Sequence, residues 1–141
     1  MMTERYWFKS SKFELELGED EEINPGIYGR QLANWLKVRL EECGYPKVEM
    51  VEEDWGRCVV CAWRPFALWV GCGNMTDAKG PKSAELPRKE DIVWHCFIGA
   101  DVFPWTRLFS KVRPESVIAK LNEDLRRILA AEPQIQLVDE P

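Results

Sequence analysis

The chain has 141 residues, of which 45% are hydrophobic and 30% are charged, and its formal net charge is −5. This length is typical of one domain, and the composition is that of a globular protein rather than of a disordered chain. The negative charge argues against a nucleic-acid partner, because phosphate backbones repel acidic proteins. The sequence has no apolar run long enough to cross a membrane and no signal peptide at its start, so we expect a cytoplasmic protein without a membrane partner.

Alternation and turn residues predict the elements of the first third of the chain. Residues 13–17 alternate apolar and acidic side chains, which predicts a half-buried strand. Asn24 and Pro25 are typical of a helix start and Gly44 of a helix end, so a helix is predicted over about residues 25–43. Its apolar side chains recur at three- and four-residue steps: Tyr28, Leu32, Trp35, Leu36, Leu40 and Cys43.

Three short apolar segments then predict strands, over about residues 56–63, 66–71 and 92–98. Only two residues separate the first two segments, which favours a hairpin. The segment 74–91 contains prolines, glycine and mixed charges, so it is predicted to be a long loop. A second amphipathic helix is predicted near residues 114–131, with a proline at each end.

This order of elements, β-α-β-β-β-α, predicts one α+β domain over residues 1–141. We expect a two-layer sandwich with a mainly antiparallel sheet of four to five strands that carries both long helices. The central strands are apolar on both sides of the pleat, as in sheets that are covered on both faces. Two helices can hardly cover both faces, so long loops, a second copy of the chain or another partner should cover the second one.

Five cysteines stand in apolar surroundings: Cys43, Cys58, Cys61, Cys72 and Cys96. This is typical of free core thiols in a reducing compartment. The spacing Cys58-x-x-Cys61 could contribute to a zinc site. Residues three apart in a strand project to opposite faces, however, so the two sulfurs should not converge on one ion. We therefore expect no metal and no other cofactor.

His95 is the single histidine of the chain and lies inside an apolar strand, which favours a structural role over catalysis. Its neighbour Cys96 should point to the opposite face. The carboxylates Glu52, Glu53 and Asp54 precede Trp55, and acids beside an aromatic ring can serve sugar chemistry or hold a basic group. A solvated turn would explain the same acids.

The seven tryptophans are the least ordinary feature of the sequence. An indole combines a large apolar surface with one N–H donor, which suits interfaces and ligand pockets. The two-residue period of a strand places five side chains on one side: Trp55, Arg57, Val59, Cys61 and Trp63. Together with the neighbouring acids they could form a surface that attracts a basic partner. The predicted binding residues are Glu53, Asp54, Trp55, Arg57 and Trp63.

Two motifs carry a resemblance: Asn24-Pro25-Gly26-Ile27-Tyr28-Gly29 and Glu53-Asp54-Trp55-Gly56. On these motifs the chain resembles small uncharacterised bacterial proteins that pair such a helix start with an acid-Asp-Trp-Gly turn. The resemblance covers about residues 24–56 and implies a bacterial origin without an established activity. In length and acidity the chain is also similar to small bacterial secretion chaperones and toxin-immunity proteins.

Three hypotheses about function follow from these patterns. The leading one is a non-catalytic protein-binding module, immunity-like or chaperone-like, that binds a protein partner or itself. The second is a small-molecule-binding pocket protein, and the third is an enzyme that uses the acidic cluster or His95 with Cys96. If Val60 and Ala62 face solvent instead, the tryptophans of this strand belong to the core.

Overall fold

The computed structural model describes residues 4–16, 18–19, 27–75, 88–105, 111 and 113–141. Its six-stranded sheet has the order β2-β3-β4-β5-β1-β6, and every neighbouring pair is antiparallel. The strands are β1 (Arg5–Ser10), β2 (Glu49–Glu53), β3 (Gly56–Ala62), β4 (Ala67–Asn74), β5 (Trp94–Asp101) and β6 (Ile135–Val138). The helices are α1 (Arg30–Glu42), the short 3-10 helix η2 (Lys89–Asp91) and α3 (Pro114–Ala131).

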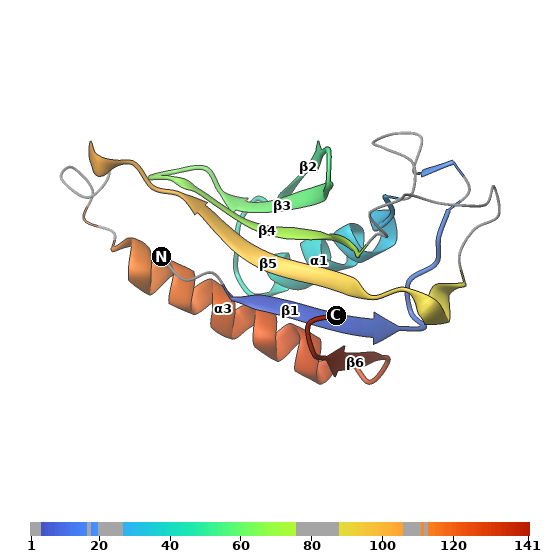
Figure 1. The fold of residues 1–141 in the computed structure, drawn as a ribbon. Coiled ribbons are helices and arrows are strands. Elements are labelled where there is room, and N and C mark those ends of the chain that lie inside the picture. Colours follow the sequence, from blue (N-terminus) through green and yellow to red (C-terminus); the bar gives the residue numbers. More distant parts are fainter. Residues whose placement is uncertain (1–3, 17, 20–26, 76–87, 106–110, 112) are drawn as a thin grey trace.

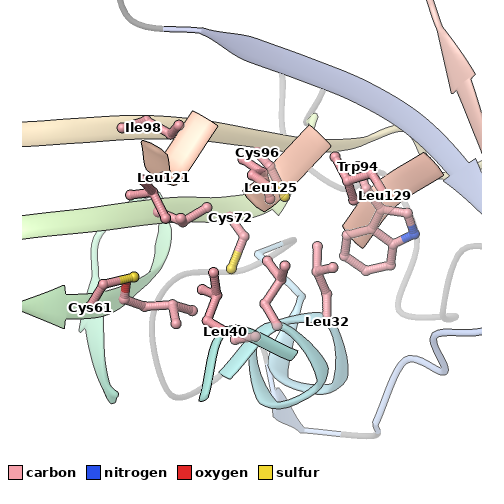
Figure 2. Packing of buried hydrophobic residues seen from close by; sticks show 14 of the residues in the cluster. Leu32, Leu40, Cys61, Cys72, Trp94, Cys96, Ile98, Leu121, Leu125 and Leu129 are labelled. Atoms are coloured by element: carbon pink, nitrogen blue, oxygen red, sulfur yellow. The ribbon is translucent and has the colours of Figure 1, made fainter. Parts of the chain in front are cut away.

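Both long helices lie on one side of the sheet, as Figure 1 shows. Helix α1 packs against β2, β3 and β4, and α3 packs against β5 and contacts α1. Leucines of the two helices meet the cysteines of the strands in one core (Figure 2). The leucines are Leu32, Leu36 and Leu40 of α1 and Leu121, Leu125 and Leu129 of α3.

The predicted α+β class with a mainly antiparallel sheet is confirmed, but the sheet has six strands instead of four or five. Strands β1, β2 and β6 lie outside the predicted elements, because their alternation is short and interrupted by charged and polar residues. Residues 13–16, predicted as a strand, form no regular secondary structure, and Leu17 lies outside the described residues. The Phe13 side chain is nevertheless buried, with ring contacts to Trp35 and Trp94.

Helix α1 begins at Arg30, later than the predicted start at Pro25. Asn24 to Gly26 lie outside the described residues, and Ile27 to Gly29 are not helical. Gly29 adopts a φ of 127°, a left-handed conformation that few other residues tolerate. The helix end is as predicted, since Gly44 follows it with a φ of 106°.

The Glu19 carboxylate, distant in sequence, caps this helix. Its Oε1 accepts hydrogen bonds from the backbone N–H of Gly29 at 2.7 Å and of Arg30 at 3.3 Å. Its Oε2 accepts one from the N–H of Glu16 at 2.8 Å. A negative charge at this place also interacts favourably with the helix dipole.

The same carboxylate joins the helix to the sheet. Arg57 of β3 lies with its Nη1 4.0 Å from Oε1 of Glu19, and neither side chain is exposed to solvent. Removing one partner of a buried ion pair is costly, because the remaining charge stays in a poorly solvating environment. Glu19 therefore holds three segments together: the N-terminal segment, α1 and β3.

We predict that Glu19→Gln lowers the free energy of unfolding by about 3 kcal/mol, because it leaves the buried guanidinium without this carboxylate. Equilibrium unfolding in urea measures the change. Glu42→Gln is the control, since Glu42 pairs with Arg39 on the exposed side of α1 and should contribute less than about 1 kcal/mol. Equal losses in the two variants would contradict the role assigned to Glu19.

Candidate functional site

The face of the sheet opposite the helices carries a series of aromatic rings. In β5, Trp94, Cys96 and Ile98 are buried toward the helices, so His95 and Phe97 project to the other side. Neighbouring rings of the series have centroids between 4.9 and 6.2 Å apart. We call this set the aromatic face: Trp7, Trp55, Trp69, His95 and Phe97.

Two glycines within strands make room for these rings. A Cβ atom on Gly99 would lie 2.1 Å from the ring of Trp69, and one on Gly71 would lie 2.5 Å from the ring of Phe97. Trp69 pairs with Gly99, and Gly71 pairs with Phe97, across β4 and β5. Each ring therefore packs directly against the glycine of the adjacent strand, a close approach that a larger residue would prevent.

The tryptophan groove is a hollow of about 310 Å³ at the β2 side of the aromatic face. Its lining includes Trp55, Trp63 and Trp69 together with Glu53 and Asp101. Trp55 is 40% exposed and Trp63 52% exposed, so indole surface is available for contact.

Charge is concentrated in the tryptophan groove. Within the part of the chain that the structure describes, neither Glu53 nor Asp101 forms an ion pair. Cys58 also lines the groove, and burial together with the charges of Glu53 and Asp101 raises the pKa of its thiol to about 11. The negative charges of both carboxylates therefore act on the same thiol, that of Cys58.

A second hollow, of about 430 Å³, lies on the other side of Trp55 and Trp69, where Arg5, Asn74 and His95 contribute to its lining. We call it the arginine groove. The guanidinium carbon of Arg5 lies 5.3 Å from the centre of the Phe97 ring, within the range of a cation–π contact.

His95 contacts two aromatic rings. Its ring stacks on Trp7 with centroids 5.0 Å apart and on Phe97 with centroids 4.9 Å apart. Burial lowers the pKa of the imidazole, the charge of Arg5 lowers it further, and Glu140 acts in the opposite direction. Among the described residues, no hydrogen-bond partner is found for the buried Nε2 of His95 or Nε1 of Trp7.

The structure separates the predicted binding residues. Glu53, Trp55 and Trp63 line the tryptophan groove, and Asp54 occupies the turn beside it without contributing to the lining. Arg57 is fully buried on the helix side of the sheet, beside Glu19. A role for these residues in binding stays a prediction.

The expectation that Trp55, Arg57, Val59, Cys61 and Trp63 share one side is wrong. The middle three are buried, and Val59 and Cys61 belong to the core beneath the helices, whereas the two tryptophans line the groove on the other face. Trp55 belongs to the turn before β3 and not to the strand. At the other end the register shifts between residues 60 and 62, which changes the side to which later residues project.

Several residues of the site were outside the sequence-based prediction, namely Arg5, Trp7, Trp69, Phe97 and Asp101. The glycines inside two apolar strands were the available signal, because a glycine in a strand often marks a close approach. The glycines alone do not indicate which ring packs over which glycine, because this depends on how β4 and β5 pair.

The cysteines have the predicted arrangement. Cys58 lines the tryptophan groove and Cys61 is buried in the core, so the two sulfurs project to opposite faces. Cys96 is likewise buried on the helix side, opposite His95. All five thiols are free. Among the described residues, no group of three or more histidine, cysteine, aspartate or glutamate side chains is placed to hold a metal ion.

Comparisons with protein-family models, with curated proteins and with solved structures found no match to this chain. The resemblance on the two motifs above therefore stays a prediction. Of the helices that the structure describes, none combines the length and the apolar character that crossing a membrane requires.

We predict that Gly99→Ala displaces the Trp69 ring and lowers the free energy of unfolding by about 1–3 kcal/mol, the usual cost of overpacking. Denaturant unfolding gives the energy, and near-ultraviolet circular dichroism reports the indole. In a Trp69→Leu background the same substitution should cost less, because the ring that it would collide with is absent. An equal cost in both backgrounds would contradict the clash.

We also predict that the pKa of His95 lies below 6.5 and rises when Arg5 is replaced by glutamine. The unfolded chain then binds more protons than the folded one below pH 6.5, so the free energy of unfolding should decrease as the pH falls from about 6.5 toward the folded pKa. Nuclear magnetic resonance can follow the imidazole directly, because the chain has one histidine. A pKa of 6.5 or higher would refute the prediction.

Proposed function

We propose that this chain is a non-catalytic protein-binding module that holds a partner protein against the aromatic face. The observation that carries this proposal is the pair of half-exposed indoles, Trp55 and Trp63, on the sheet face opposite both long helices. Tryptophan side chains are enriched among the anchor residues of protein interfaces, because each removes a large apolar area from water on contact.

Charge favours a basic partner over a second copy of the chain. The net charge of −5 makes two copies repel each other at long range. The carboxylates of the tryptophan groove, Glu53 and Asp101, would attract a partner that presents lysine or arginine and would increase the rate of its association. The aromatic rings would then supply contact area once the partner arrives.

The contacts of His95 favour a structural role over catalysis. The imidazole stacks on Trp7 and on Phe97, and the neighbouring thiol of Cys96 lies in the core on the opposite side of the sheet. The ring thus completes the aromatic series. This arrangement supports the proposal that the protein binds its partner without catalysing a reaction.

A small-molecule-binding protein is the second candidate, on the strength of the arginine groove. Its volume of about 430 Å³ falls within the range of pockets that take small ligands. Arg5 would supply a positive charge there, and the flat faces of Trp55 and Phe97 would stack on a planar ligand. A small anionic ligand that protects His95 and the Arg5 side chain in solution would favour this candidate.

We predict that the double variant Trp55→Ala/Trp63→Ala loses partner binding while it keeps the fold. Affinity capture from an extract of the source organism, compared between wild type and variant, should identify a basic protein retained by the wild type alone. Calorimetry with that purified protein should then show binding weakened by at least about tenfold, as for interface anchors. The urea midpoint should change little, because both indoles are partly exposed.

Val38→Ala is the matched control, since Val38 is an exposed apolar residue of α1, on the helix layer. This variant should retain the partner as the wild type does. Sedimentation should show a monomer for the free chain. The proposal would be overturned by capture that does not depend on the two tryptophans, or by a dimer that the double variant converts to monomers.

A further inference from the structure

We propose that the tryptophan groove is a cage for one cationic side-chain end, of lysine or arginine, that the partner inserts. This inference rests on the proposed function and adds the chemistry of recognition. Three indoles, Trp55, Trp63 and Trp69, and two carboxylates, Glu53 and Asp101, line the same hollow. Aromatic rings with nearby negative charge are the arrangement that proteins use to bind organic cations.

The indoles are held in place by contacts within the sheet. Trp55 and Trp69 have ring centroids 6.2 Å apart, with planes inclined by 33°. The Nε1 of Trp63 donates to Oε2 of Glu49 at 3.3 Å, which links this indole to β2. Tryptophan has the strongest cation–π interaction of the aromatic side chains.

The two carboxylates approach the groove from separate strands. Glu53 ends β2 and Asp101 ends β5, at opposite sides of the β3–β4 pair. Both residues line the groove together with Cys58, and both raise the pKa of its thiol. Several other acids have ion-pair partners, as Glu41 has Lys37, whereas these two lack an ion pair with any described residue.

The size of the groove favours one side-chain end over a larger ligand. Its volume of about 310 Å³ is at the lower limit of the roughly 300–1,000 Å³ of pockets that bind drug-sized molecules. The half-exposed rims formed by Trp55 and Trp63 leave the groove accessible from the surface, so a residue on a partner protein can enter it. A free quaternary ammonium compound has the same cationic chemistry, and the experiment below distinguishes it from a protein side chain.

The test titrates the wild-type chain with three blocked tripeptides, Gly-Lys-Gly, Gly-Arg-Gly and Gly-norleucine-Gly, and with choline. Nuclear magnetic resonance follows the indole N–H signals of Trp55, Trp63 and Trp69. The lysine or arginine peptide should bind at least about fivefold tighter than the neutral norleucine peptide, which corresponds to one exposed cation–π contact. Salt should weaken the binding.

The double variant Glu53→Gln/Asp101→Asn should abolish this preference for the cation while it keeps the shape of the groove. Glu42→Gln, on the exposed side of α1, is the control and should leave it unchanged. Equal binding of the norleucine peptide, or no binding of either basic peptide, would overturn the cage. Binding of choline alone would assign the groove to a free ammonium compound and would also overturn the inference.

Partner capture separates failure of the cage from failure of the proposed function. If Trp55→Ala/Trp63→Ala loses the partner while Glu53→Gln/Asp101→Asn binds it as the wild type does, the aromatic face is a binding surface without a cation cage. If neither double variant affects capture, the proposed function itself fails. Loss of the partner in both variants, with unchanged unfolding midpoints, supports both.

Discussion

Two helices cover one face of a six-stranded sheet, and this unequal covering determines how the other face must be built. The strands are apolar on both sides, so the open face has to reduce its own exposure. It does so with large rings that pack against glycines of neighbouring strands, Gly71 and Gly99. Rings that cover the backbone in this way remain exposed on their outer side. The packing that shields the strands therefore also leaves an aromatic surface suited to contact.

The buried pair of Glu19 and Arg57 links this face to the helix layer. Arg57 lies in β3, directly after the turn that carries Trp55, and its partner carboxylate caps α1. The position of the turn is thus tied to the position of the helix start. The proposed binding surface rests on paired strands and on a buried ion pair, so it would lose little conformational freedom on contact, and such preorganisation favours affinity.

The two grooves differ in charge although they share Trp55 and Trp69 in their linings. The tryptophan groove contains carboxylates from β2 and β5, and the arginine groove contains Arg5 from β1. A single partner with a basic group at one end and an acidic group at the other would match the charges of both grooves. This polarity would also fix the orientation of the partner, because the reversed orientation brings like charges together.

The sequence by itself determined the fold class, the second helix, the end of α1 and the opposite orientations of Cys58 and Cys61, because these depend on local periodicity. It could not locate β1, β2 and β6, whose short strands are stabilised by partners remote in the chain, nor Glu19 as the cap of α1. The candidate site depended most on tertiary structure. A turn at Trp55 and a register shift after Val60 place Trp55 and Trp63 on the face opposite Arg57, and only strand pairing brings Asp101 and Trp69 beside them.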